Sequence, residues 1–328
     1  MRNERHITRR KLLAGMGAAA VALPAFAASD EVWPRRPIRL VVPFAAGNGL
    51  DVVARLVGDH LARALGQPIV VDNRPGAAGV IGASTVAKSA PDGYTLLISP
   101  DSLITLMPHI NSKLPYDPFK DFAPVTRLTS VPLYLITTPN QPYQNVAEFI
   151  AAAKSKPGLI NYGSYGVGSS AHTRMEYFND LAGTKLTHVP YANSPIPELL
   201  SGLVQVAFDA GAVVLPMLRA EKLKVIATTS ARRTAALPDV PTVAETLPGY
   251  EGDGWHGIYY PKGTPLEIVA RMNTELVKIV TDPELKRRLA DLSIEAAGTS
   301  AADLDRYARH ESGKWGRIAR EHNIRIDS

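Results

Sequence analysis

The sequence predicts an α/β fold with two lobes and a ligand cleft between them. Runs of β-branched residues alternate with amphipathic helical patterns, which is typical of a parallel sheet covered by helices. This alternation occurs twice along the 328 residues, and a stretch with only helical patterns follows the second series. The chain is therefore expected to build part of one lobe, form the other, and return.

The first series begins with the strand "IRLVVPF" (38–44) and an amphipathic helix over 51–65. The strands "PIVVDN" (68–73) and "YTLLISP" (94–100) come next, with a small-residue helix between them. This order favours a parallel sheet, in which the carboxyl ends of the strands share one edge.

The second series starts after a connection and has similar units. Its expected strands are "VPLYLITTP", "LINYGSYGVGSS" with a Gly/Ser loop, "LTHVPY", "VQVAFDA" and "LKVIATTS". A proline- and glycine-punctuated connection over 230–254 leads back, and helices are expected over 265–280, 282–292 and 301–322.

Two crossings between the lobes are expected, near 127–132 and near 246–256. One lobe then comprises 29–128 together with 249–328, and the other comprises 129–248. In such a two-lobed α/β body, ligands bind at the cleft that the strand ends face.

The composition excludes several classes of protein. The chain has no cysteine, which excludes disulfides, thiolate metal sites, a cysteine nucleophile and a lipid-modified cysteine. Its net charge is +5, but most of that excess lies in the first eleven residues. The nearly neutral remainder argues against binding of nucleic acid.

The basic start belongs to an expected export signal over 1–28. An apolar run over 12–23 is too short to span a membrane, and it leads to the small-x-small cleavage site "AFA" at 25–27. The pair Arg9–Arg10 followed by two leucines favours twin-arginine export, and an ordinary secretory signal is the alternative. The mature protein is expected to be soluble, in a bacterial periplasm.

Known catalytic and cofactor motifs are absent or weak. A dinucleotide motif that starts at Gly47 fails at Val52, and the match over 166–171 is weak by itself. The nucleophile elbow of serine hydrolases fails because Tyr162 stands two residues before Ser164. The histidines have no metal-ligand spacing, whereas a carboxylate pair made in space stays open. We expect no catalysis, cofactor or metal.

Three loops follow strands and precede helices, at 43–51, 99–102 and 163–172. Each is rich in Gly, Ser or Asp, and each exposes backbone N–H groups where a helix begins. Such groups, together with the helix dipole, favour a carboxylate or a phosphate. Helix capping explains each loop taken singly, but two such loops from opposite lobes favour a ligand between them.

A series of sequence motifs, taken in order, is specific to one family. The stretch 37–83, which opens with "PIRLVVPFAAGNGLD", is followed by "APDGYTLLIS", "KLPYDPFKDFAPVTRL", "LINYGSYGVGSSAH", "HVPYANS", "LPDVPTVAE" and "YPKGTP". In these motifs the chain resembles the Bug-type periplasmic substrate-binding proteins of the tripartite tricarboxylate transporter family, over essentially the whole mature length.

The resemblance implies a type II periplasmic-binding-protein fold whose two lobes close on a small carboxylate-bearing solute. It implies a receptor, expected to be a monomer, that delivers this solute to membrane permease subunits. The alternative is a receptor with the same ligand that serves a two-component sensor kinase. An exported hydrolase that uses the same cleft is a third hypothesis.

The resemblance and the three loops together give the expected substrate-binding residues. Those of the first lobe are Phe44, Ala45, Ala46, Gly47, Asn48, Gly49, Asp51, Ser99 and Asp101. Those of the second lobe are Ser164, Tyr165, Gly168, Ser169, Ser170, His172, Pro190, Tyr191 and Asp209. Asp209 is expected to fix either a ligand hydroxyl or a neighbouring loop.

Some residues depart from the usual family pattern. Asn48 and Leu50 replace Gly and Thr in the first loop, and Tyr165 and Val167 intervene in the second. If Leu50, Tyr165 and Val167 face the pocket, they favour an aromatic or aliphatic carboxylate rather than citrate. The alternative is that these side chains point into the lobes.

Overall fold

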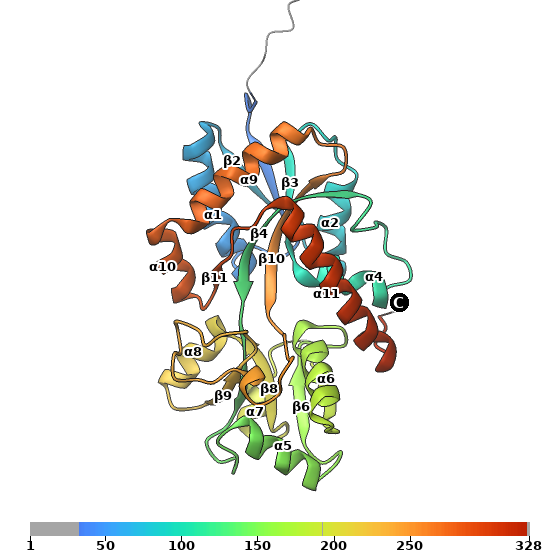
Figure 1. Cartoon of the computed structure of the whole chain (residues 1–328), viewed down its shortest axis with the longest axis vertical. Helices are drawn as coiled ribbons and strands as arrows, with labels where there is room; N and C mark the ends of the chain where they lie inside the picture. The colour runs from blue at the N-terminus through green and yellow to red at the C-terminus, as the bar shows by residue number, and fades with distance from the viewer. Residues whose placement is uncertain (1–32, 192, 327–328) are drawn as a thin grey trace, which may run out of the picture. The chain divides into compact units, whose positions relative to one another are not determined.

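The computed structural model describes residues 33–191 and 193–326 (Figure 1). The expected export signal over 1–28 lies outside the described residues. Pro34–Ser328 forms one compact unit that contains two β-sheets. None of the helices described there has the length and apolar character that a bilayer span needs.

The first sheet has six strands in the order β11-β4-β10-β3-β1-β2. Its strands are β1 (Ile38–Val42), β2 (Ile69–Asn73), β3 (Thr95–Pro100), β4 (Phe122–Val131), β10 (Gly254–Pro261) and β11 (Glu295–Ala296). β1 pairs in parallel with both β2 and β3, whereas β10 is antiparallel to β3 and β4. The helices of this part are α1 (Gly49–Leu65), α2 (Val80–Ala87), α3 (Asp101–Thr105), α4 (Met107–Ile110), α9 (Leu266–Thr281), α10 (Pro283–Asp291) and α11 (Ala301–Glu321), with the 3-10 turn η2 (Ala77–Gly79).

The second sheet has five strands in the order β7-β6-β8-β5-β9. Its strands are β5 (Leu133–Thr137), β6 (Asn161–Ser164), β7 (Thr187–Pro190), β8 (Val206–Ala210) and β9 (Lys224–Thr228). β6 is parallel to β7 and β8, and β5 is antiparallel to β8 and β9. Its helices are α5 (Val146–Ser155), α6 (Ser170–Ala182), α7 (Ile196–Ser201) and α8 (Gly211–Arg219), with the 3-10 turn η3 (Val243–Glu245). We call the part built on the first sheet lobe I and the part built on the second sheet lobe II. The residue boundaries of the lobes given above remain a prediction.

The helices that start in the loops predicted at 43–51 and 163–172 begin at polar caps. The Asn48 side chain accepts a hydrogen bond from the Asp51 N–H at the start of α1, and the helix ends at Gly66 in the left-handed conformation. The Ser169 side chain accepts one from the His172 N–H at the start of α6. The Asn48 cap explains why α1 begins two residues before the predicted position.

The long strands β4 and β10 lie side by side and carry the chain between the lobes (Figure 1). Only Pro132 separates the end of β4 from the start of β5. Neither strand is predicted by periodicity, because β10 is buried at every position and β4 contains Pro124.

The register places the carboxyl ends of the parallel strands at this crossing. In lobe I, β10 starts where β3 ends, with His256 opposite Pro100. In lobe II, β5 starts where β8 ends, with Leu133 opposite Ala210. Because β4 leads directly into β5, the loops that follow β1, β3, β6, β7 and β8 all lie at the sheet edges nearest the crossing.

The hydrophobic core is continuous through both lobes. One cluster of buried residues includes Val41 and Leu97 of lobe I, Tyr162 and Phe208 of lobe II, and Trp315 of α11. α11 packs on β4 and α3 and also contacts α6 of lobe II. The lobes are therefore joined by packed side chains as well as by the two strands.

Candidate ligand-binding site

The buried carboxylate of Asp51 fixes the backbone of the first-lobe loop. Its carboxylate is 2% exposed and accepts hydrogen bonds from the Gly47 N–H at 2.8 Å, the Asn73 amide at 2.9 Å and the Arg55 guanidinium at 3.0 Å. The same Asn73 amide also donates to the Phe44 carbonyl oxygen. Burial alone would raise the pKa of Asp51, but the hydrogen bonds from Arg55, Gly47 and Asn73 outweigh burial and lower this pKa. Asp51 thus shapes the loop.

The rest of this loop is open. Ala45, Ala46, Gly47 and Gly49 are exposed, whereas Phe44 and Asn48 are half-buried. Gly47 has a φ of +86°, a conformation that favours glycine. Because the loop leads directly into the 17-residue helix α1, its exposed backbone lies at the positive end of a helix dipole.

Asn48→Ala is expected to lower the free energy of unfolding by about 1 kcal/mol, because α1 loses its cap. Urea denaturation checks this value. Asn145→Ala is the matched control, since Asn145 caps α5 of lobe II in the same way. Both variants should lose similar stability, but only Asn48→Ala should change the ligand response. If Asn48→Ala were as stable as the parent, the role of Asn48 as the stabilising cap of α1 would be contradicted.

The second-lobe loop rests on buried side chains. Ser164 is 0% exposed, and its hydroxyl lies 2.6 Å from His188 Nε2. The Gly168 N–H donates to His172 Nδ1 at 3.0 Å, and His172 is 6% exposed. Ser164 and His172 therefore support the loop from inside the lobe, and Ser169 and Ser170 are half-buried at the start of α6.

His172 and His188 stack on each other with ring centroids 3.8 Å apart. Burial lowers the pKa of His188 to about 4. Burial, and then the neighbouring His188 and His322, lower the pKa of His172 to about 3. Both imidazoles are neutral at pH 7, so each has one donor and one acceptor nitrogen, and His172 Nδ1 is the acceptor for the Gly168 N–H.

Asp209 is 3% exposed and lies at the end of β8. Its two carboxylate oxygens accept hydrogen bonds from the Tyr165 hydroxyl at 3.1 and 2.9 Å, and one also accepts from the Ala210 N–H. Burial raises the pKa of Asp209 to about 6, against the effect of these bonds. Of the two roles expected for Asp209, the contacts match that of fixing a neighbouring loop.

Pro190 and Tyr191 lie beside the second-lobe loop. Pro190 is opposite Ser164 in the β6–β7 register, and the Tyr191 N–H donates to the Ser164 carbonyl oxygen at 3.1 Å. Pro190 is exposed and Tyr191 is half-buried. These two residues therefore border the loop at the carboxyl edge of the sheet.

The third predicted loop is turned inward. Ser99 is 0% exposed and donates to the Pro100 carbonyl oxygen, and Asp101 is 5% exposed. The Asp101 carboxylate pairs with Arg174 of lobe II at 2.6 Å. Sequence reasoning missed Arg174, and an arginine beside the apolar Met175, Tyr177 and Phe178 of "SAHTRMEYF" was the available signal.

The residues that depart from the family pattern have different surroundings. Leu50 is 4% exposed, on the covered side of α1, whereas Tyr165 and Val167 are 40% and 45% exposed. The prediction of a more apolar pocket is therefore kept for Tyr165 and Val167. For Leu50 the alternative, a side chain directed into the lobe, matches its burial.

Among the described residues, the carboxylates of Glu251 and Glu311 and the imidazole of His310 come within 4.8 Å of one another. The ammonium of Lys314 lies 2.6 Å from Glu311 and donates to the Glu251 carbonyl oxygen. A cation of the protein thus already lies at this cluster, which gives no support for a metal site.

Comparison with known proteins identifies the family. The model of the tripartite tricarboxylate transporter family receptor, TctC, matches residues 53–324. The chain belongs to this family. BugT of Bordetella pertussis is 33% identical over 96% of this chain and 98% of its own length. A second relative, from Bordetella bronchiseptica, is 34% identical over 96% of this chain and 94% of its own length.

Solved structures of TctC-type receptors share the two-lobed fold. Rpa4515 of R. palustris, solved with adipate, is 34% identical with a TM-score of 0.78, and the match covers 90% of this chain and 100% of that one. MatC of Rhodopseudomonas palustris, solved with malate, is 32% identical with a TM-score of 0.71, over 87% and 99% of the chains. The periplasmic binding protein BugD is 29% identical with a TM-score of 0.74, over 90% and 100%. This TctC receptor thus has the fold that its motifs predicted, and it is a solute receptor of the transporter family.

Proposed function

We propose that this TctC receptor captures a small organic carboxylate between its lobes in the periplasm and passes it to membrane permease subunits. The observation that supports this most is the placement of two loops, 44–49 and 165–170. Each starts a helix, and they come from different sheets, at edges nearest the same crossing. Neither loop contains Lys or Arg, so the loops offer an anion their backbone N–H groups, the helix dipoles and the hydroxyl groups of Ser169 and Ser170.

The mechanism follows from this arrangement. A carboxylate bound to one loop gains further hydrogen bonds when the other loop approaches, so the ligand favours the closed lobes. Closure changes the outer surface, which lets a permease distinguish a loaded receptor from an empty one. Nothing in this cycle requires catalysis, and we propose that the protein is not an enzyme. The family match does not favour the alternative of a sensor-kinase receptor.

The ligand is proposed to have a carbon-rich body. Tyr165 and Val167 extend from the second-lobe loop with 40% and 45% of their surfaces exposed. Their burial against an aliphatic or aromatic ligand removes apolar surface from water. Two relatives were solved with adipate and with malate, which are both carboxylates. Calorimetry in which citrate bound more tightly than every carbon-rich mono- or dicarboxylate would contradict this ligand class.

The test of the function is a thermal-shift series of aliphatic, aromatic and amino-acid carboxylates, each paired with its uncharged amide. A ligand at 100 times its Kd stabilises the folded state by about 2.7 kcal/mol, which raises Tm by roughly 5 °C or more. The amides should not raise Tm. The function would be refuted if every carboxylate left Tm unchanged. Loss of uptake of the same carboxylate in a deletion strain then tests delivery.

A further inference from the structure

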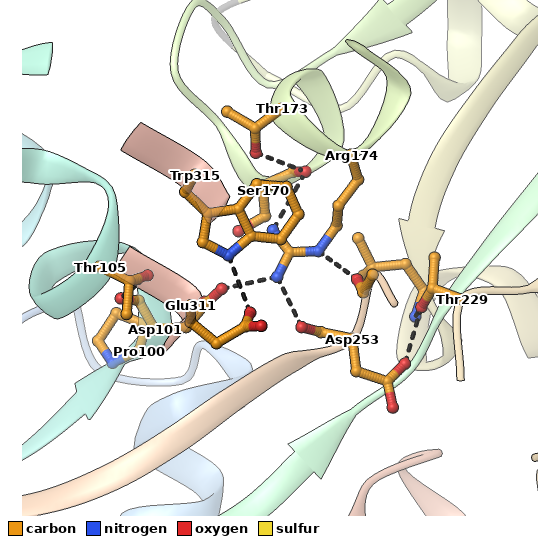
Figure 2. Close-up of polar contacts among 12 residues, drawn as sticks. Pro100, Asp101, Thr105, Ser170, Thr173, Arg174, Thr229, Asp253, Glu311 and Trp315 are labelled. Atoms are coloured by element: carbon orange, nitrogen blue, oxygen red, sulfur yellow. Dashed lines mark hydrogen bonds and ion pairs between the residues drawn. The ribbon is translucent and has the colours of Figure 1, made fainter. Parts of the chain in front are cut away.

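Arg174 joins both lobes and the crossing between them (Figure 2). It lies on α6 of lobe II, and its side chain is 1% exposed. Its Nη2 lies 2.6 Å from Asp101 Oδ2 of lobe I and 2.8 Å from the Asp253 carbonyl oxygen. Its Nε donates to the Gly252 carbonyl oxygen. Residues 252 and 253 directly precede β10, so one guanidinium contacts lobe I and the returning strand at once.

The surroundings of Arg174 hold its guanidinium in one place. The group lies over the Trp315 ring at 4.8 Å from the centroid, and the Trp315 indole donates to Glu311 at 2.9 Å. The Tyr250 hydroxyl donates to the Arg174 carbonyl oxygen. A planar guanidinium can serve a carboxylate and two carbonyls together, which an ammonium cannot do with the same geometry.

Two partners of Arg174 lie close to the ligand loops, one in the chain and one through the sheet. Its Nη1 lies 3.4 Å from the Ser170 carbonyl oxygen, at the first residue of α6 and next to the second-lobe loop. Asp101 is the first residue of α3 and follows β3, whose neighbour β1 leads into the first-lobe loop. Asp253 is fixed in turn by hydroxyl groups of Ser130 and Thr229.

We infer that Arg174 is a positioning residue for ligand capture, which sets the relation of the two ligand loops through Asp101 and the carbonyls at 252–253 and does not touch the ligand. This inference rests on the proposed function. A buried ion pair contributes little net stability, but removal of one partner is costly. The Arg174–Asp101 pair therefore serves to fix the positions of the two lobes. Loss of the guanidinium fork frees α6 to shift against α3.

The test measures the distance between the lobes in the ligand-free protein. Because the chain has no cysteine, Ala64→Cys on α1 and Ala151→Cys on α5 give two spin-label sites, both exposed. In this labelled parent we expect one narrow distance distribution. Arg174→Lys should broaden or shift it by several ångströms. Asp101→Asn, which keeps the shape and an acceptor oxygen, should do the same to a smaller extent.

The second readout is titration with adipate of the parent and the variants, with folding checked by circular dichroism. Arg174→Lys should weaken binding about tenfold, the equivalent of ~1.4 kcal/mol. Arg233→Lys is the control, since Arg233 pairs with Glu245 at 2.8 Å on the exposed surface. It should change neither the distances nor the affinity.

The outcomes separate this inference from the proposed function. An unchanged distance distribution in folded Arg174→Lys and Asp101→Asn proteins overturns the inference, whatever the affinity. A changed distribution with affinity equal to that of Arg233→Lys also overturns it. If the parent binds no adipate, adipate is removed from the proposed ligands. The distances alone then support or overturn the role of Arg174 in holding the lobes.

Discussion

Replacement of Asp51 by alanine is expected to lower the free energy of unfolding by about 3 kcal/mol and to abolish the thermal shift produced by carboxylates. The Asp51 carboxylate is 2% exposed and accepts bonds from Gly47, Asn73 and Arg55. Its removal leaves the half-buried Asn73 amide without this acceptor, at a cost of about 1–3 kcal/mol. The exposed Gly47 N–H also loses its acceptor, at a smaller cost because water can replace it. Arg55 is half exposed and adds little, because water screens it.

Urea denaturation and thermal shift measure the two effects. Glu284→Ala is the matched control, because Glu284 pairs with Arg288 four residues away, as Asp51 does with Arg55. Glu284 is exposed, so this variant should lose less than about 1 kcal/mol and keep its ligand response. Equal losses in the two variants would show that the loop does not depend on the buried carboxylate.

Acid is expected to remove about 3 kcal/mol of stability between pH 6.5 and pH 4 through His172 and His188. In the folded state the pKa of His172 is lowered to about 3 and that of His188 to about 4, from an ordinary value of 6.5. Below pH 6.5 the unfolded chain therefore binds protons that the folded chain does not. The stabilisation is complete above pH 6.5 and is lost as pH falls towards these values. The magnitude allows for the partial exposure of His188 to water.

Polar and aromatic side chains surround His172 and His188. Ser164 and Tyr162 contact His188, and Glu176 Oε1 lies 3.9 Å from His172 Nε2. Urea unfolding at pH 7, 5.5 and 4 should show a smaller loss in His188→Gln than in the parent. His310→Gln, which alters an exposed histidine outside this pair, is the control. A parent whose stability is constant from pH 7 to pH 4 would contradict the neutral buried pair.

The sequence predicts the fold well where local patterns are strong. The alternation around β1, α1 and β2 and the polar residues before α1 and α6 are local signals, and the structure has these elements. β10 could not be predicted because a strand that is buried on both faces shows no alternation of apolar and polar residues. β4 could not be predicted because it contains a proline, which argues against a strand. Their identity depends on pairing with strands that are distant in the chain.

The candidate site also has a part that could be predicted from the sequence and a part that could not. The positions of the three loops follow from the order of strands and helices, so their place at the sheet edges could be predicted. The roles of single side chains could not, because their partners lie elsewhere in the sequence. Asp101 binds Arg174, 73 residues away, and Asp209 binds Tyr165, 44 residues away. A motif identifies such residues but does not show whether they face a ligand or the protein.

The central claim is that backbone N–H groups from both lobes hold a carboxylate. A crystal structure of the receptor with the carboxylate that gives the largest thermal shift tests it most directly. We expect carboxylate oxygens about 3 Å from N–H groups, or from waters bound to them, in both 44–49 and 165–170. A carboxylate held by Lys or Arg side chains, or bound away from these two loops, would contradict the claim.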